Sequence, residues 1–558
     1  MLKHVKVIAT NEEILGNKKP KAEIQELIFR LPLLSIFVLL SQISSNEVDE
    51  NVLKKEFKET YIGLLNKQFD GNPPPKVVSE RVYTTLLDKF NKTLENALFP
   101  QQSILQLWKW VLAYGDPEKI DLYQENGCLT QICYLALLVN DHLDQPNQRV
   151  SNEQLYAYLF SNTVFNNEDN LFTTIARTVM IYSDIAKNKE LYNNKEFLDI
   201  NEDFYRVNGY KIKEYIAVIY SLIVVFLKPK DLGLNWTQHK EEMLSHTKLA
   251  PLAREIINSI IVDYETISKW AKQELDSIWD FTEFRKKPLL LLENEQFLPF
   301  SLKLLNEQLF NGLFHKVRHI YPDKDTRFLS FFGKPFEKYT QILLRESINQ
   351  SKLPYVFLPE FTYGKAGVKH SPDIMLRLNN KLLAIEVKSY RVSLPSAAEA
   401  NVESIKKDTN KMIIAPLKQV HDRVNELREL GHESLKGIDE IYLMVVNQGY
   451  FPTLKPYEGI IQENLSSHFS VPIKGYYHLD IEEFEMLCML IERKRPIFNM
   501  LNNKSLETNR YLPFKVFLKE NSYHLKKNTI HKNQFIKIID EIGNMLFDDF
   551  SVEVNKFH

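Results

Sequence analysis

The chain has 558 residues, of which 44% are hydrophobic and 25% are charged, and this length allows two to four ordinary globular domains. A net charge of −2 argues against a uniformly basic nucleic-acid-binding protein. The three cysteines, Cys128, Cys133 and Cys488, show neither a metal-ligand spacing nor a disulfide framework. No signal peptide is evident, and the longest apolar runs fall short of the ~20 residues that cross a bilayer. We therefore expect a soluble, cytoplasmic protein without a membrane partner.

The first 325 residues predict a large, all-helical region without a recognisable catalytic motif. Apolar residues at helical spacing mark helices over 21–41, 48–69, 77–98, 103–113, 152–160, 170–186, 210–227 and 252–279. The stretch 228–236 interrupts this pattern and marks a candidate boundary within the region. The region contains no nucleotide-binding loop, so we expect it to have a regulatory, recognition or assembly role.

A helix and a strand follow this region. Residues 333–344 predict a helix whose first turn contains Pro335 and whose buried stripe is Phe336, Tyr339 and Leu343. The same helix carries Glu337. The apolar run 355–358 predicts the first strand of a sheet.

The next segment predicts a β-hairpin, because Asn379 and Asn380 separate two strand-like runs and Asn tolerates the left-handed backbone of a two-residue turn. In such a hairpin, paired positions sum to 379 + 380 = 759. Asp373 therefore lies opposite Glu386, with Cβ atoms about 4.5–5.5 Å apart. Lys388 follows two residues later and shares the face of Glu386. The pattern thus places two carboxylates and one ammonium together.

These residue types suit metal-dependent hydrolysis of a phosphodiester. A hard cation neutralises charge on the phosphate and lowers the pKa of a bound water. Mg²⁺ prefers oxygen ligands and often takes only one or two protein carboxylates, which suits Asp373 and Glu386, with the Val387 carbonyl as a third ligand. Lys388 would orient the nascent hydroxide or offset transition-state charge, and burial beside the metal should lower its pKa. The alternative is a solvated strand face without chemistry.

The elements after the hairpin complete an alternating pattern. Residues 401–430 predict a helix that is apolar on one side, contains Pro416 near a first turn or kink, and carries Gln419. The run 441–446 predicts a buried central strand, and 469–479 predicts another strand. A further helix should begin at Asp480, with Glu483 completing a capping box.

Pro372-Asp373 followed by Glu386-Val387-Lys388 resembles the PD-(D/E)xK (restriction-endonuclease-like) nuclease superfamily. The resemblance covers about 160 residues, roughly 328–495, and implies supporting roles near the metal for Glu337 and Gln419. The alternative for both is an ordinary helix residue. We accordingly expect a mixed α+β and α/β protein. Its all-helical N-terminal region (1–325) would precede a nuclease domain (326–495) and a basic helical C-terminal extension (496–558).

Two groups of basic residues are candidates for contacts with phosphate. Residues 493–537 contain eleven Lys or Arg against two Glu, a local charge of +9. This segment either tracks a nucleic-acid backbone or packs against the acidic helical region. Its apolar stripes favour the second alternative and consist of Phe514, Val516, Phe517, Phe535, Ile536, Ile539 and Leu546. The basic residues near the hairpin are better placed and are our first choice for phosphate contacts: Lys365, Lys369, Arg391, Lys406 and Lys407.

The sequence therefore predicts a Mg²⁺-dependent deoxyribonuclease in which Mn²⁺ can substitute. Restriction and anti-phage effectors commonly join such a nuclease to a large sensing region, so defence is the expected role, by analogy of architecture. DNA is the expected partner, together with a companion defence protein or a second copy of the chain. The alternatives are a nuclease acting on RNA, repair junctions or transposon ends, and a degenerate nuclease fold that serves as a binding or scaffold module.

Overall fold

The chain divides into two compact units that interleave along the sequence. The computed structural model describes residues 8–45, 53–55, 57–60, 88, 91–93, 95–124, 127–143, 151–167, 169–227, 234–364, 367–523 and 528–548. The N-terminal unit comprises Met1–Arg149 and Glu214–Gly312, and the C-terminal unit comprises Val150–Lys213 and Leu313–His558. Residues 150–213 thus belong with the C-terminal unit, so the expected boundary near residue 325 does not coincide with this division.

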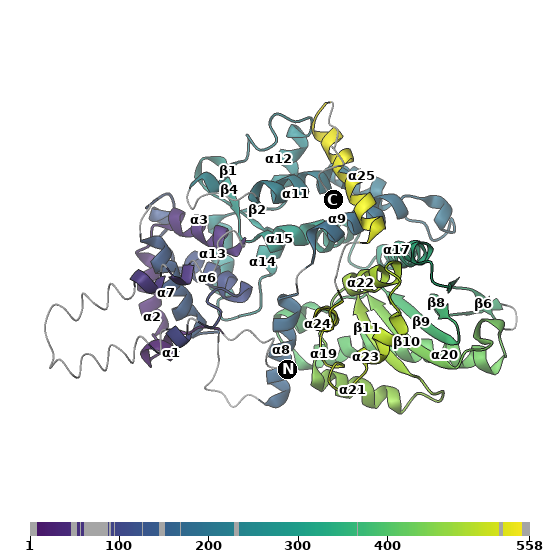
Figure 1. Cartoon of the computed structure of the whole chain (residues 1–558). Coiled ribbons are helices and arrows are strands. Elements are labelled where there is room, and N and C mark those ends of the chain that lie inside the picture. Colours follow the sequence, from purple (N-terminus) through teal and green to yellow (C-terminus); the bar gives the residue numbers. More distant parts are fainter. Residues whose placement is uncertain are drawn as a thin grey trace. The chain divides into compact units, whose positions relative to one another are not determined.

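The N-terminal unit is built mainly from helices (Figure 1). They are α1 (Asn11–Leu15), α2 (Lys21–Phe29), α3 (Leu33–Ser44), α6 (Gln101–Tyr114), α7 (Cys128–Asn140), α11 (Ile212–Leu227, which begins at the unit boundary), α12 (Ala250–Asn258), α13 (Tyr264–Gln273), α14 (Thr282–Lys286) and α15 (Leu302–Glu307). The predicted helix 21–41 is broken at Pro32, which separates α2 from α3. The predicted helices 48–69 and 77–98 lie largely outside the described residues.

The expectation of an all-helical N-terminal region is wrong. A four-stranded sheet of order β1-β4-β3-β2 lies within it. Its strands are β1 (Gln238–His239), β2 (Ile261–Asp263), β3 (Leu289–Leu291) and β4 (Gln296–Pro299). β2 divides the predicted helix 252–279 into α12 and α13. Strands of two to four residues are too short to show the alternation that distinguishes a strand in sequence.

The core of the N-terminal unit is rich in indole rings. All five tryptophans of the sequence lie in this unit, at positions 108, 110, 236, 270 and 279. Trp108 is fully buried and stacks on Phe37, with 5.5 Å between ring centroids. The buried ammonium of Lys109 donates to the carbonyls of Glu274 and Ser277, which satisfies its charge with backbone oxygens.

No described helix alone has the length and apolarity to cross a membrane. Helices α2 and α3 pass such a test when taken together, but they are bent by 109° at their break.

The C-terminal unit combines helices with a five-stranded sheet (Figure 1). Its helices are α8 (Asn152–Phe165), α9 (Leu171–Val179), the π-helix η3 (Met180–Ile185), α10 (Ile200–Asn208), α16 (Leu313–Arg318), α17 (Arg327–Ser351), α18 (Leu394–Ala398), α19 (Val402–Thr409), the π-helix η9 (Asn410–Ile414), α20 (Ala415–Glu429), α21 (Lys455–Ser466), α22 (Ile481–Glu492), α23 (Ile497–Lys504), α24 (Phe514–Glu520) and α25 (Thr529–Leu546). Both units together make a mixed α and β protein.

The sheet has the order β11-β10-β9-β8-β5. Its strands are β5 (Tyr355–Pro359), β8 (Ile374–Leu378), β9 (Lys381–Lys388), β10 (Glu440–Asn447) and β11 (Gly475–Asp480). β9, β10 and β11 are parallel, whereas β8 is antiparallel to both β9 and β5. The predicted strands 355–358 and 441–446 are confirmed, and the predicted strand 469–479 is shorter, beginning at Gly475.

The predicted hairpin and its register are confirmed. Ile374 pairs with Ile385 and Leu378 pairs with Lys381, so paired positions sum to 759. Asn379 adopts a φ of +55°, in the left-handed region that the tight turn requires. Helices α17 and α22 pack on one face of the sheet, and α20 with η9 packs on the other. Both faces of β9 are therefore buried, as is usual where parallel strands form the sheet centre.

Two predicted helices differ from the structure. Pro335 does not lie in a first turn, because α17 begins at Arg327 and includes Pro335 in its interior. The predicted helix 401–430 consists of α19, η9 and α20, and Pro416 occupies the first turn of α20. The capping box at Asp480 is confirmed, since Asp480 accepts from the Glu483 N–H while the Glu483 side chain accepts from the Asp480 N–H.

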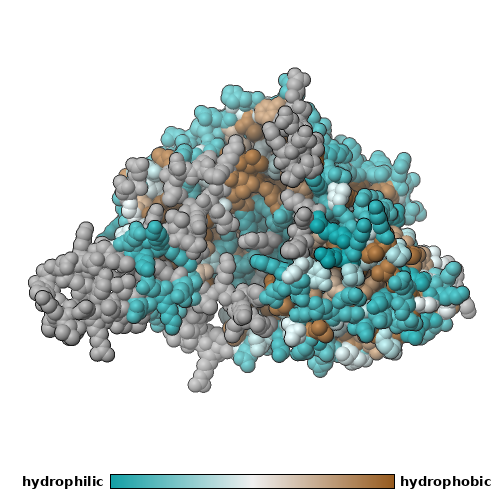
Figure 2. Space-filling view, in the orientation of Figure 1, coloured by the Kyte–Doolittle hydropathy of each residue, from teal (hydrophilic) through white to brown (hydrophobic). Residues whose placement is uncertain are grey.

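The basic C-terminal extension packs onto the chain through apolar residues. Phe514 and Phe517 of α24 and Leu546 of α25 are buried, as the apolar stripes predict. Helix α25 also buries Ile538 and Ile542, while Ile536 and Ile539 are half-buried. Lys515 pairs with Glu482 at 3.0 Å, so part of the basic charge is neutralised internally. On the face seen in the space-filling view, the described surface of the C-terminal unit is mainly hydrophilic with scattered hydrophobic patches (Figure 2).

Candidate metal-dependent site at the open end of the hairpin

The predicted carboxylates meet where β8 and β9 separate. Asp373 directly precedes β8 and is 7% exposed, and Glu386 near the end of β9 is 1% exposed. The Asp373 Oδ2 accepts a hydrogen bond of 2.7 Å from the Val387 N–H, which joins the two strands beyond their last regular pair. Ser371 fixes the turn before Asp373, because its hydroxyl accepts from the Phe361 N–H at 3.0 Å.

Two cations flank the buried Glu386 carboxylate. Lys388 Nζ lies 2.7 Å from Oε1, and an Arg423 guanidinium nitrogen from α20 lies 2.7 Å from Oε2. Arg423 also donates to the Ser371 carbonyl at 3.3 Å. With its amide nitrogen turned toward the site, Gln419 donates to Glu386 Oε1 at 3.3 Å and accepts from Arg423 at 2.5 Å. The predicted Gln419 therefore lies at the cluster.

Glu337 reaches the same cluster from α17, which packs on the opposite face of the sheet. Gln341, one helical turn later, donates to Glu337 Oε1 at 2.8 Å and to the Asp373 carbonyl at 3.4 Å. Gln341 thereby connects α17 to the start of β8. The structure thus brings together all five predicted catalytic side chains, Glu337, Asp373, Glu386, Lys388 and Gln419.

Burial and neighbouring carboxylates raise the pKa values of Asp373 and Glu337. Burial, and then repulsion by Glu386 and Glu337, raises the pKa of Asp373 well above its usual value, although the Val387 N–H and Lys388 oppose the shift. Burial, followed by repulsion from Glu360, raises the pKa of Glu337, and Glu386 adds to this shift. A site that concentrates unfavourable negative charge has a physical reason to take up a cation.

The pKa of Lys388 is raised here, whereas the lowered pKa expected from the sequence referred to the ammonium beside a bound metal. Burial of the ammonium lowers this pKa, but the Coulomb attraction of Glu386 and the hydrogen bond to it outweigh burial. The Glu386 carboxylate lies only 2.7 Å from the ammonium, which explains why its attraction outweighs burial.

The donor set fits a hard divalent cation. Among the described residues, the structure records a protein donor to Asp373 Oδ2 but none to Oδ1, so this oxygen is available as a ligand. The Lys388 carbonyl accepts from the Gln448 N–H beside β10, so the neighbouring Val387 carbonyl points to the opposite side, toward Asp373. Carboxylate and carbonyl oxygens at one point are the ligands that Mg²⁺ prefers. Asp373, Glu386 and Val387 therefore remain the candidate metal ligands.

Another potential metal-binding group is formed by His421, Asp422 and His468. Asp422 Oδ1 lies 3.1 Å from His421 Nδ1 and 2.7 Å from His468 Nε2. However, His421 Nε2 accepts from the backbone N–H groups of Ser470 and Val471. Neutral His421 consequently carries its proton on Nδ1, the atom that would face the metal. The group is better explained as a hydrogen-bonded anchor for the loop before β11.

No known protein-family model and no curated protein matches this chain. The candidate site is therefore defined by the chemistry of its own residues.

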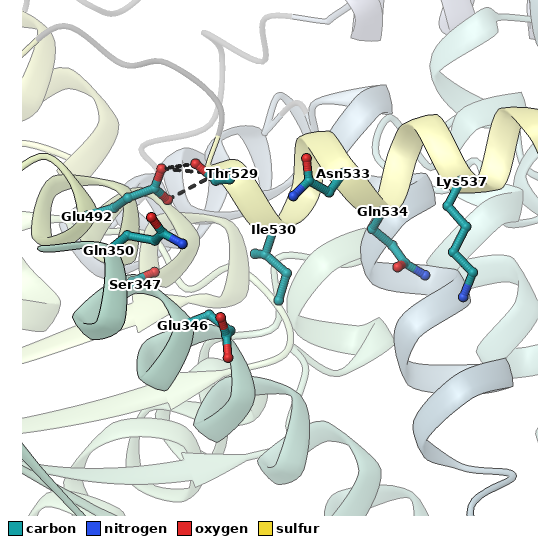
Figure 3. A pocket seen from close by; sticks show the side chains of 9 residues that line it. All are labelled: Glu346, Ser347, Gln350, Glu492, Thr529, Ile530, Asn533, Gln534 and Lys537. Carbon is teal, nitrogen blue, oxygen red and sulfur yellow. Dashed lines mark hydrogen bonds between the residues drawn. The ribbon is translucent and has the colours of Figure 1, made fainter. Parts of the chain in front are cut away.

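Two cavities of the C-terminal unit lie apart from the carboxylate cluster. A cavity of about 280 Å³ lies between α17, the end of α22 and α25, as Figure 3 shows. Glu492 accepts hydrogen bonds from Thr529 at its rim and so caps the first turn of α25. None of the predicted site residues lines this cavity. A second cavity, of about 330 Å³, lies along β11.

The candidate phosphate contacts have different surroundings. Lys369 on β7 (Lys369–His370) is exposed and pairs with Glu426 of α20 at 2.9 Å. Lys406 is exposed and pairs with Glu153 and Glu403, and its neighbour Lys407 is also exposed. Lys365 lies outside the described residues.

Arg391 is wrongly assigned as a phosphate contact. Its guanidinium lies 3.8 Å from the centroid of the Phe314 ring and hydrogen-bonds Tyr182. Burial lowers its pKa to about 10, despite the opposing effect of Tyr182. The side chain therefore has a packing role in the C-terminal unit.

Arg423 and Gln341 are the site residues that the sequence analysis missed. Each follows a predicted residue by four positions, Arg423 after Gln419 and Gln341 after Glu337. Side chains four apart lie on the same face of a helix. That spacing is the signal that identifies both from sequence.

Proposed function

We propose that this protein is a Mg²⁺-dependent nuclease of the PD-(D/E)xK type that hydrolyses phosphodiester bonds in DNA. The observation that carries the proposal is the buried Asp373–Glu386 pair across the hairpin, with Lys388 held 2.7 Å from Glu386. Burying two carboxylates beside Glu337 is unfavourable for folding, because each carboxylate repels the others. This cost is better explained by a functional role than by a structural one.

In the proposed mechanism, the cation would be held by Asp373, Glu386 and the Val387 carbonyl. Mg²⁺, or Mn²⁺ in its place, would neutralise charge on the substrate phosphate and lower the pKa of a water molecule. Lys388 orients the attacking water and offsets negative charge that develops on the phosphate. Glu337 and Gln419 orient the water or the ligands without supplying the main ones.

Arg423 has a proposed role in substrate binding that was not predicted from the sequence. Its guanidinium neutralises Glu386. A guanidinium can bind phosphate through two parallel hydrogen bonds, so Arg423 would contact the substrate phosphate if a cation held Glu386. Exposed Lys369, Lys406 and Lys407 would add contacts to the DNA backbone.

The proposed biological role is restriction or anti-phage defence. Its support is the architecture, in which a second compact unit of the same chain is large enough to sense a trigger or to assemble with a companion protein or another copy. Expression in a phage-sensitive host, followed by phage challenge, tests this role. Wild-type protein should reduce plaque formation and Lys388→Ala should not, and equal plaque counts for both would contradict it.

Incubation of the full-length protein with plasmid, single-stranded DNA and RNA tests the chemistry. We expect cleavage of DNA with Mg²⁺ or Mn²⁺ and none with EDTA. Asp373→Ala and Lys388→Ala should abolish cleavage. The exposed Glu399→Ala and Lys436→Ala remove the same charges elsewhere and should retain it. Cleavage of RNA alone would overturn the substrate, and full activity of both site variants would overturn the site.

A further inference from the structure

The second cavity of the C-terminal unit has the features of a ligand site. It measures about 330 Å³, within the range of small-molecule pockets, which begins at about 300 Å³. It lies along β11, the terminal strand of the five-stranded sheet, so that one edge of β11 is not paired within the sheet. Helix α21 and the segment from Lys504 to Phe514 form the remaining walls.

Lys504, in the last turn of α23, brings a buried positive charge to this cavity. The residue is 8% exposed, and its ammonium donates to the carbonyls of Asn509 and Arg510 at 3.2 and 2.8 Å. Among the described residues, no carboxylate forms an ion pair with it. Burial lowers its pKa to about 8, more than attraction by Glu458 and Glu483 can offset. Backbone carbonyls accept from two of the three N–H groups of the ammonium, but they carry no formal charge to balance it.

Arg510 adds a second cation to the same wall. One of its guanidinium nitrogens donates to the Tyr476 hydroxyl at 3.1 Å. A guanidinium has five N–H donors, and this is the side-chain hydrogen bond that the structure records for Arg510 among the described residues. Lys474 is exposed and also lines the cavity. The cavity thus presents three cationic side chains.

One acidic side chain of the lining already has a hydrogen-bond partner. Glu458 of α21 is 5% exposed, and its Oε1 lies 2.6 Å from Nε2 of His478 on β11. Glu458 attracts the Lys504 ammonium, but among the described residues it forms no ion pair with Lys504 or Arg510. Oxyanions are the ligands that arginine and lysine bind together most effectively.

We propose that this cavity binds the phosphate group of a small molecule, with Arg510 and Lys504 as its anion-binding residues. The rings of Phe469, Tyr476 and Phe514 line the same space and offer flat surfaces to a planar ring. Free phosphate and a nucleoside monophosphate share the proposed chemistry. The proposal does not depend on the nuclease function, since none of the residues at the hairpin lines this cavity.

Thermal unfolding and calorimetry of the full-length protein test the proposal, with inorganic phosphate, AMP and adenosine as probes. EDTA is present throughout, so that no probe binds through a metal at the carboxylate site. We expect phosphate or AMP to bind and to raise the midpoint of unfolding, and adenosine not to do so. Stronger binding of AMP than of phosphate identifies a nucleotide-like ligand, and equal binding identifies the free anion as sufficient.

Arg510→Gln is the decisive variant, because it removes the positive charge from a side chain that otherwise donates a hydrogen bond to Tyr476 and lies over the Tyr511 ring. It should weaken binding of the effective probe by at least about tenfold. Lys519→Gln removes one positive charge from an exposed position of neighbouring α24 and should leave affinity unchanged. The proposal fails if neither phosphate nor AMP binds, if adenosine binds as well as AMP, or if Arg510→Gln binds like wild type.

Discussion

Replacing Arg423 by methionine tests whether Glu386 depends on an internal cation in place of a metal. The guanidinium is 2.7 Å from a carboxylate that is 1% exposed, and its own side chain is 21% exposed. A hydrogen bond to a charged group contributes about 1.5–3 kcal/mol, and partial exposure of Arg423 favours the lower half of that range. The upper limit for breaking a buried pair, about 3–5 kcal/mol, is not expected, because Lys388 still neutralises the other oxygen.

We therefore expect Arg423→Met to lower the local stability of the hairpin by about 1.5–2 kcal/mol. Amide hydrogen exchange of a peptide covering β8 and β9 measures this change, since it reports on that segment alone. Arg428→Met, at an exposed position of the same helix, is the control and should change stability by no more than about 0.5 kcal/mol. In a Glu386→Gln background, the Arg423 substitution should cost much less.

The response to Mg²⁺ tests whether Arg423 and a metal compete for Glu386. At a free concentration about ten times the dissociation constant, binding stabilises the folded state by about 1.4 kcal/mol. Because Arg423 no longer competes for Glu386, the variant should bind Mg²⁺ more tightly and gain more protection than wild type. Equal gains in the two proteins, or no gain in either, would refute the argument that Arg423 occupies the place of a metal.

Three further outcomes follow from the site and its surroundings. In EDTA, the pKa values of Asp373 and Glu337 are raised in the folded state, so the stabilising contribution of these groups is present at low pH. This contribution is lost as the pH rises through the folded-state pKa values. Urea titrations at a series of pH values should show that Asp373→Asn weakens this pH dependence of stability. Glu337→Ala and Gln419→Ala should reduce the cleavage rate less than Asp373→Ala, and a complete loss in either would make it a main ligand or acid–base group. Lys406→Glu combined with Lys407→Glu should weaken DNA binding and flatten the log–log salt dependence by about 1.8, whereas an unchanged slope would exclude both residues as phosphate contacts.

The hairpin was predictable because its rules are local. A two-residue turn fixes register by arithmetic, and the side-chain period of two then fixes the face, so Asp373 and Glu386 meet as expected. The contacts of Gln341 on α17 and Arg423 on α20 could not be predicted without knowing how these helices pack on the sheet. Helical spacing narrows the candidates to Gln341 and Arg423, but only the fold brings them to the carboxylates.

Other features have no local signature in the sequence. The buried pair of Arg177 and Glu485, 2.8 Å apart, joins α9 to α22 across more than 300 positions of chain, and neither residue stands out in its own segment. Arg391 looks like a surface cation, yet the Phe314 ring covers its guanidinium. Such contacts arise from tertiary packing, which overrides the usual preference of charged side chains for solvent.

The distribution of tryptophan gives each unit its own spectroscopic behaviour. Since all five indoles lie in the N-terminal unit, their fluorescence emission reports that unit and is silent about the hairpin. Large proteins with several compact units often unfold in more than one step. A denaturation curve followed by indole emission therefore describes one half of the molecule, and its offset from a curve followed by backbone ellipticity measures how far the two units unfold independently.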